Sequence, residues 1–435
     1  MGAVDGVARL LAGAYAVSAY GNYLNLIALS LFSYEVTGTA FGVGLVMALR
    51  LGAGFVAGLT AGALTARISR RTVMIGADAA QGTTMVVLAL CASHTPLALL
   101  AGAVVVLGAG NTYFTVALRS AVPVIVGQDA RARVNGLLVT ARSMATVLGF
   151  ASAAAVIGFG GYALAFTVNA VSFAVSATVL LVLRPRTDAP PEEPAAEPAD
   201  PAPDGERVGR WRRAAAGLPA LLLGLVALRG LDALASSSHN VALPVVAHAE
   251  TPDQPALFMT QFWASWAVGT VLAHLVLRRQ GEAAWSERAF ALGTCAMALS
   301  FTAAFLGLPA AGLMAAAACA GFADGWTEII YTSRLQALPD RRRGWLFGLS
   351  ATAEQSGFAL GTVAAAGALE VLPPLAVVGA FHGAALCGGL VLLLYTFGRF
   401  GGARSTPSTP ATGGEPREEE NADGTRPGAG GLPRS

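Results

Sequence analysis

Long apolar runs constrain this chain more than any other feature of its sequence. When each run is bounded by the nearest charges, turns or prolines, twelve runs reach about 20 residues or more, the length at which a helix crosses roughly 30 Å of hydrocarbon. They lie at residues 10–33, 40–66, 72–92, 97–118, 134–157, 162–183, 214–247, 255–277, 288–307, 310–333, 345–369 and 374–397. The sequence therefore predicts an all-α membrane protein with twelve transmembrane helices.

The composition agrees with a membrane protein and excludes a soluble enzyme. Only 12% of the residues are charged and the mean hydropathy is +0.59, whereas soluble domains carry roughly 25% charged residues. A net charge of +2 gives no ground for a nucleic-acid partner. Four widely spaced cysteines predict neither a disulfide framework nor a metal site. No nucleotide-binding or catalytic motif is present, so we expect no cofactor and an ion gradient as the energy source.

The arginines predict how the chain is oriented in the membrane. All basic residues are Arg, and 25 of the 28 lie at the two ends of the chain or in alternate connections between the runs. Arginine-rich connections remain on the cytoplasmic side of a membrane. We therefore predict a multi-pass protein of the cytoplasmic (inner) membrane with both termini and the central connection in the cytoplasm.

A Pro-rich segment divides the chain into two halves. Asp188 to Glu206 contains only Pro, Ala, Asp, Glu and Gly, a composition that cannot bury a core. We predict a six-helix half at residues 1–183, a cytoplasmic Pro/Ala/acidic linker at 184–213, a second six-helix half at 214–397 and a disordered cytoplasmic tail at 398–435.

An internal repeat supports two pseudo-symmetric halves. A shift of 212 residues superposes Arg131, Gly136, Leu137, Thr140 and Gly149 on Arg343, Gly348, Leu349, Thr352 and Gly361. Parallel repeats of six spans are typical of transporters whose halves rock about a site near the bilayer midplane.

Five segments of the chain carry short motifs: Ser18 to Asn22, Ala28 to Ala40, Gly62 to Arg71, Asn169 to Phe173 and Leu335 to Gly344. Together these motifs resemble the major facilitator superfamily, in particular its bacterial exporter branch of enterobactin exporters and transmembrane secretion effectors. Asn22 and Ala66 stand where the family often has Asp. The resemblance implies twelve helices, alternating access and a cavity lined by helices one, four, seven and ten, with helices three, six, nine and twelve facing lipid.

Ionisable and amide residues inside the spans are the candidate site, because a charge at mid-bilayer costs at least ~2.5 to 3.5 kcal/mol. In the tenth span, Asp324 and Glu328 share a helix face. Two carboxylates so close resist ionising together in a dry site, so one of them is predicted to carry a proton, with Asp232 as the fallback carrier. The alternative is that both are solvated near the cytoplasmic mouth. Arg229 and Asp232 either form a self-satisfied ion pair or take part in coupling.

The predicted substrate cavity contains Asn22, Asn25, Arg50, Asn111, Arg142, Arg229, His239, Asn240 and Glu354. Arg142 and Glu354 occupy equivalent repeat positions, and one hypothesis pairs them across the cavity. Arg50 either binds an anionic substrate group or neutralises an acid on a neighbouring helix. His239 is either a substrate ligand or a satisfied interior side chain.

The loop after the second span is the predicted gate. Its residues are Gly62, Arg67, Arg70 and Arg71, and Asp78 is expected to pair with one of these arginines from the next span. Two runs of small residues, Gly54-x-x-x-Gly58-x-x-x-Gly62 and Gly357-x-x-x-Gly361-x-x-x-Ala365, predict close helix contacts.

These observations predict a monomeric secondary transporter, most simply a proton-coupled exporter of a small amphipathic organic molecule, with substrate, protons and the lipid bilayer as its partners. Uptake of an anionic solute is the first alternative, favoured by Arg50, Arg142 and Arg229. A non-transporting membrane sensor or scaffold on the same fold is the second, and the missing Asp at Asn22 and Ala66 is its only support.

Overall fold

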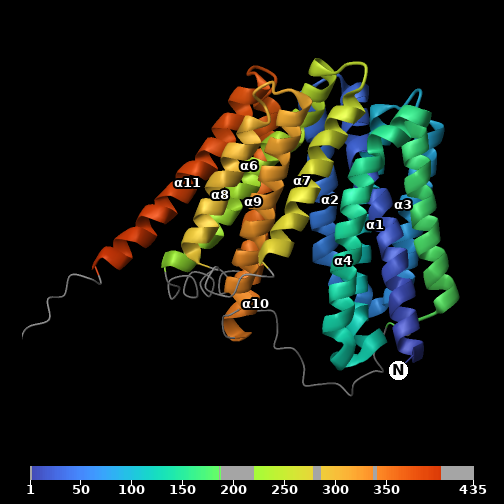
Figure 1. Ribbon diagram of the computed structural model, residues 1–435. Coiled ribbons are helices and arrows are strands. Elements are labelled where there is room, and N and C mark those ends of the chain that lie inside the picture. Colours follow the sequence, from blue (N-terminus) through green and yellow to red (C-terminus); the bar gives the residue numbers. More distant parts are fainter. Residues whose placement is uncertain (1, 186, 188–219, 278–285, 337–339, 403–435) are drawn as a thin grey trace, which may run out of the picture. The chain divides into compact units, whose positions relative to one another are not determined.

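The structure is a computed structural model that describes residues 2–185, 187, 220–277, 286–336 and 340–402. Within these residues every regular element is a helix (Figure 1). The helices are α1 (Gly2–Thr37), α2 (Ala40–Arg67), α3 (Arg70–Leu90), α4 (Leu97–Leu183), α6 (Ala220–Glu250), α7 (Pro255–Leu277), α8 (Glu287–Ala303), α9 (Ala310–Gln336), α10 (Asp340–Ala368) and α11 (Pro374–Gly402). The predicted linker segment 188–206 and residues 403–435 lie outside the described part.

Helix α4 accounts for three of the twelve predicted spans. It has 87 residues, which would extend about 130 Å if straight, several times the hydrocarbon thickness. It turns back at Gly161, whose φ of +63° lies in the left-handed region that favours glycine. This is the glycine turn at which the sequence separates the fifth and sixth spans, and Figure 1 shows the resulting rods side by side.

Apolar length alone identifies fewer spans than the fold contains. Seven segments of the described residues are long and apolar enough to cross a membrane, and one of these, Leu137–Leu183, has the length of two spans. Helices α9 and α10 carry Asp324, Glu328 and Glu354, which lower their hydropathy, and α8 has only 17 residues. The remaining predicted spans are therefore present as helices, although their length or hydropathy alone would not identify them as transmembrane.

Short polar connections end one helix and begin the next. Gly38 adopts a φ of +69° after α1, and the Thr39 hydroxyl accepts a hydrogen bond from the Gly42 N–H at the start of α2. The Ser69 hydroxyl similarly accepts from the Thr72 N–H at the start of α3. These side chains satisfy backbone donors that the first turn of a helix leaves without partners.

Glycines create equivalent helix contacts in the two halves. In the first half, a Cβ on Gly108 of α4 would overlap the carbonyl oxygen of Arg50 on α2. In the second half, a Cβ on Gly321 of α9 would overlap the carbonyl oxygen of Trp266 on α7. Both pairs bring the second and fourth helices of a half to backbone contact, as small residues do in membranes.

The repeat-related pair Gly149 and Gly361 confirms the predicted alignment. A Cβ on Gly149 would lie 2.8 Å from the Tyr20 carbonyl oxygen of α1, and one on Gly361 would lie 3.0 Å from the Leu234 Cα of α6. Each glycine therefore brings the fifth helix of its half against the first. Of the small-residue runs predicted from sequence, Gly54, Gly357 and Gly361 make close contacts, whereas Gly62 faces open space.

The two halves meet at the end of the helices that lacks arginine. There the Phe41 N–H donates to Glu370 Oε1 at 2.8 Å, the rings of Tyr34 and His248 lie 4.7 Å apart, and the Ala154 N–H donates to Thr260 Oγ1 at 2.9 Å. One apolar core joins both halves at this end.

Toward the arginine-rich end, each half has an apolar core of its own. One of these cores includes Phe114 and Leu180, and the other includes Phe290 and Leu346. The contacts described between the halves thus close the arginine-free end.

Candidate functional site: a cavity between the halves and a neighbouring charge cluster

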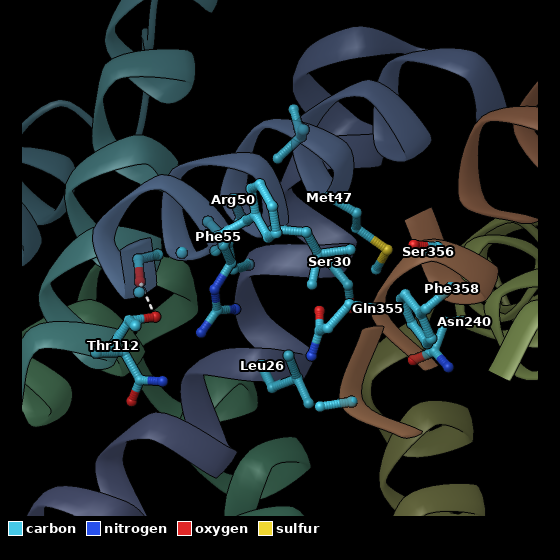
Figure 2. Close-up of a pocket in the computed structure, with 18 of the residues that line it drawn as sticks. Leu26, Ser30, Met47, Arg50, Phe55, Thr112, Asn240, Gln355, Ser356 and Phe358 are labelled. Carbon is cyan, nitrogen blue, oxygen red and sulfur yellow. Dashed lines mark hydrogen bonds between the residues drawn. The ribbon is translucent and has the colours of Figure 1, made fainter. Parts of the chain in front are cut away.

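A cavity of about 720 Å³ lies between the two halves. Its walls come from α1, α2 and α4 of the first half and from α6 and α10 of the second (Figure 2). Its volume lies within the range of pockets that bind small organic molecules. Most of the wall is apolar, and its polar members are Ser30, Ser33, Arg50, Asn111, Thr112, Asn240, Thr352, Gln355 and Ser356.

Arg50 is the only charged residue among those lining the cavity. It extends from α2 into the space between Leu26 and Thr112, and Gln355 enters the same space from α10 of the other half (Figure 2). Of the two sequence hypotheses for Arg50, neutralisation by a neighbouring acid finds no support, because no ion pair with Arg50 is found among the described residues.

A charge cluster lies beside the cavity, between α6, α9 and α10. Arg229 forms ion pairs with Glu328 of α9, with Asp232 one turn further along α6 at 3.4 Å, and with Glu354 of α10 at 3.5 Å. The predicted Arg229–Asp232 pair is therefore confirmed, but it is one part of a larger network. Arg229 and Asp232 are largely buried, with 14% and 8% of their side chains exposed.

Hydrogen bonds and an aromatic ring extend this cluster along α9 and α10. The Tyr331 hydroxyl donates to Ser350 Oγ at 2.7 Å, and Ser350 donates to Glu354 Oε1 at 2.8 Å. The Arg229 guanidinium also lies over the Tyr331 ring, 5.9 Å from its centroid. The carboxylate of Glu354 is therefore held by Ser350 on α10 and by Arg229 on α6.

Asp324 and Glu328 occupy the same face of α9, as predicted, but in different surroundings. Glu328 is half exposed, whereas Asp324 is half-buried and lies close enough to Arg229 and Glu328 for their charges to interact. One guanidinium thus faces four carboxylates, those of Asp232, Asp324, Glu328 and Glu354. The predicted proton carriers are brought together.

The predicted pairing of Arg142 with Glu354 across the cavity is wrong for this structure. Arg142 Nε donates to the Tyr23 hydroxyl at 2.8 Å within the first half, and Glu354 pairs with Arg229 within the second. Each charge has a partner inside its own half, and Arg142 also lies close enough to Glu328 of α9 for their charges to interact. The side chain of Arg142 is exposed and does not line the cavity.

His239 is part of a buried histidine pair rather than a cavity ligand. Its Nδ1 lies 3.1 Å from Nε2 of His382 on α11, and both rings stack on Phe301. Both side chains are buried, so the reading of His239 as a satisfied interior residue is the one that the structure supports. The next residue, Asn240, lines the cavity as predicted and lies 3.3 Å from His239 Nε2.

The three asparagines predicted to line the cavity have different positions. Asn111 does line it. Asn25 is fully buried between helices, and Asn22 is half-buried; neither is among the lining residues. A position in the first span predicts the helix but does not specify the face on which a residue lies.

The four ionisable or amide residues predicted inside the helices expected to face lipid are buried. Asp78, Gln81, Asn169 and His382 are each at most 1% exposed. A lipid-facing helix still has one face packed on the bundle, and polar side chains occupy that face because hydrocarbon offers them no partner. These four side chains therefore pack inside the bundle, and the lipid-facing position of their helices stays a prediction.

The predicted gate residues mainly connect α3 to the end of α4. Arg71 donates to the carbonyl oxygens of Leu180 and Leu181 at 2.9 and 3.2 Å, and Arg70 donates to that of Thr187 at 2.8 Å. Arginine thereby satisfies carbonyls that the last turn of a helix leaves without partners.

The predicted pairing of Asp78 with one of these arginines is not observed. Asp78 is buried beside Ser176 of α4, and it makes no ion pair with Arg67 or Arg71 in the described part of the chain. Arg67 and Gly62 are exposed, and their place in the gate stays a prediction.

Several site residues were not predicted from the sequence. Gln355, Ser30 and Ser33 line the cavity, and Tyr331 and Ser350 orient Glu354. Gln355 directly follows Glu354, so one turn of α10 faces both the cluster and the cavity, a signal that was available in the sequence. The described residues contain no group of His, Cys, Asp or Glu arranged to hold a metal ion.

Two six-helix halves with a cavity between them define a class of protein, the secondary transporters of membranes. The sequence profile described as Major Facilitator Superfamily matches residues 11–362. The chain therefore belongs to this superfamily, and it is a transporter rather than an enzyme.

A solved structure has the same fold. The chain resembles a bacterial homolog of the human lysosomal transporter Spinster, solved in an inward-facing and unoccupied conformation, with a TM-score of 0.63 and 14% sequence identity. The alignment covers 90% of this chain and 95% of the other. No curated protein matches the sequence. At this identity the likeness concerns the fold alone.

Proposed function

We propose that the protein is a proton-coupled exporter that moves a small amphipathic organic molecule across the cytoplasmic membrane by alternating access. The observation that carries the proposal is the cluster of one guanidinium and four carboxylates beside the cavity. The protein acts as a monomer with both termini in the cytoplasm.

The balance of charge in the cluster supports a proton as the coupling ion. With all four carboxylates ionised, these five groups would carry a net charge of −3 within a membrane domain, where Coulomb repulsion is poorly screened. Binding a proton to one carboxylate relieves this repulsion. Glu328 is the member best placed to exchange protons with water, because its side chain is half exposed.

The position of the cluster supports coupling to substrate. Glu354 contacts Arg229, while Ala351, Gln355 and Ser356 on the same two turns of α10 line the cavity. Protonation of a carboxylate weakens its ion pair with Arg229. Because these ion pairs join α6, α9 and α10, their loss lets α10 move at the cavity wall. Proton binding and substrate binding therefore act on the same helix.

The contacts between the halves support alternating access. They lie at the arginine-free end, and with the arginine-rich connections in the cytoplasm this arrangement is the inward-facing state. Transport then requires the contact between Phe41 and Glu370 to open and the arginine-rich ends to approach each other.

The direction of transport rests on the sequence resemblance to exporters. The test compares small molecules in the medium and inside cells that make the wild-type protein, the Glu328→Gln variant or no protein. We expect at least one molecule to be enriched in the medium by the wild type alone, and a protonophore to remove the enrichment. Enrichment inside the cells would instead support uptake, and no change in either compartment would support a sensor or scaffold.

A further inference from the structure

We propose that the cavity recognises amphipathic molecules that carry a single acidic group, and that Arg50 binds this group. This inference rests on the proposed function in one respect, because it takes the cavity as the transport site. It adds the chemical class of the substrate and the residue that selects it.

The surroundings of Arg50 differ from those of the other arginines inside the spans. Arg229 has three carboxylate partners and Arg142 donates to Tyr23. Arg50 lines the cavity, and no acidic partner is found for it among the described residues. A guanidinium without a counter-ion is unfavourable inside a membrane. A planar anion such as a carboxylate offers it two parallel charge-assisted hydrogen bonds.

The backbone around Arg50 is held firmly. Gly108 of α4 packs directly against the Arg50 carbonyl, and Gly54, one turn further along α2, faces Gly108 and Thr112. The side chain therefore projects from a fixed point on the wall rather than from a mobile loop. Such preorganisation reduces the entropy lost when a ligand is bound.

The rest of the cavity fits an apolar body with few polar groups. Leu26, Met47 and Phe55 line the cavity from the first half, as Arg50 does, and Phe358 lines it from α10 of the second (Figure 2). Asn240 and Gln355 supply neutral amides from the second half. A molecule with its acid on Arg50 and its body against Phe358 would contact both halves, as a substrate must if it is to change their equilibrium.

The same arrangement disfavours cations. Among the described residues that line the cavity none is acidic, and the carboxylates of Glu328 and Glu354 in the charge cluster are engaged by Arg229. An amphipathic amine would meet the charge of Arg50 with no compensating anion. The cavity is therefore selective for the sign of charge as well as for apolar surface.

The experiment measures equilibrium binding of three probes that share one apolar body, pyrenebutyrate, pyrenebutanol and pyrenebutylamine, to the full-length protein purified in detergent. Wild type is compared with Arg50→Gln, Arg50→Lys and the control Arg119→Gln, which removes an exposed arginine outside the cavity. All samples contain the same micelles, so partitioning of the probes into detergent is the same in each.

We expect the wild type and Arg119→Gln to bind the carboxylate at least about tenfold more tightly than the alcohol, and the amine most weakly, because a charged hydrogen bond is worth roughly that factor or more. Arg50→Gln should bind the carboxylate and the alcohol equally, and Arg50→Lys should retain part of the preference. If the wild type binds the alcohol or amine as tightly as the carboxylate, the inference is wrong. It is also wrong if folded Arg50→Gln keeps the preference.

The comparison of the three probes on the wild type decides the matter even if Arg50→Gln does not fold. Failure of this inference is distinct from failure of the proposed function, since binding is measured without a proton gradient. A preference for the carboxylate without proton-driven transport would retain the inference and reject coupling.

Discussion

Arg229 Nε lies 3.5 Å from Glu354 Oε1, so the central cation of the charge cluster on α6 contacts the helix that forms the cavity wall. The neighbouring residue Gln355 faces the cavity. The charge cluster and the cavity are thus contacted by adjacent residues of α10. This proximity is the structural basis of the coupling that we propose, and it leads to the predictions below.

Removing the cation should destabilise the second half. In Arg229→Gln, four carboxylates lose their shared partner, and breaking a buried ion network by deleting one member costs roughly 3 kcal/mol. This figure is the lower end of the usual cost for a buried pair, and it applies because Glu328 is half exposed. We expect the apparent melting temperature of the detergent-purified protein to fall by several degrees at neutral pH and to recover partly at lower pH, where the carboxylates bind protons. An unchanged melting temperature would show that Arg229 does not hold α6, α9 and α10 together.

The glycine contact between α2 and α4 should tolerate no side chain. Gly108→Ala would drive a Cβ into the Arg50 carbonyl, whereas Gly102→Ala on the same helix meets nothing within 4 Å. We expect Gly108→Ala to reduce the yield of monodisperse protein and to weaken pyrenebutyrate binding. Gly102→Ala should leave both unchanged or slightly improve stability, since alanine favours a helix by roughly 0.5 to 1 kcal/mol over glycine. Equal behaviour of the two variants would contradict the backbone contact.

Arg71 should influence transport more than binding. Its contacts join α3 to the end of α4 within one half and lie away from the cavity. Arg71→Ala should slow transport while leaving the affinity for pyrenebutyrate within about twofold of wild type. A parallel loss of transport and affinity would indicate a folding defect, which the melting temperature would reveal.

The orientation can be tested by labelling. Cysteine tags in the linker between Asp188 and Glu206 and at Ser435 should be inaccessible to a membrane-impermeant reagent added to intact cells, because the non-membrane arginines lie on that side of the membrane. Both tags should react after the cells are opened. Labelling of either tag in sealed cells would overturn the predicted topology.

The fold could be predicted from the sequence because its signals are local. Runs bounded by charges, turns and prolines located α8 and α9, which are not selected by length and hydropathy alone. The 212-residue repeat aligned Gly149 with Gly361, which make equivalent contacts. The i, i+3 spacing of Arg229 and Asp232 likewise predicted a pair that is present.

Partners on different helices could not be predicted in the same way. The sequence does not specify the rotation of α11 about its axis, which brings His382 to His239 rather than to lipid. It also does not specify which neighbouring group Arg142 contacts, and in the structure this is the Tyr23 hydroxyl and not Glu354. Glu354 and Gln355 are adjacent in sequence, and only the positions of the neighbouring helices show that the first contacts Arg229 and the second lines the cavity.

The most direct test of proton coupling measures accumulation of the exported molecule in reconstituted vesicles under an imposed pH gradient, alongside its downhill exchange. The variants are Glu328→Gln, Asp324→Asn and Asp232→Asn, and Glu250→Gln removes an exposed acid outside the cluster as the control. We predict that Glu328→Gln or Asp324→Asn abolishes gradient-driven accumulation but retains exchange, because an amide keeps the shape of the carboxyl group and cannot carry its proton. If all three cluster variants still concentrate the molecule with only a proton gradient imposed, the carboxylates around Arg229 do not couple transport to protons.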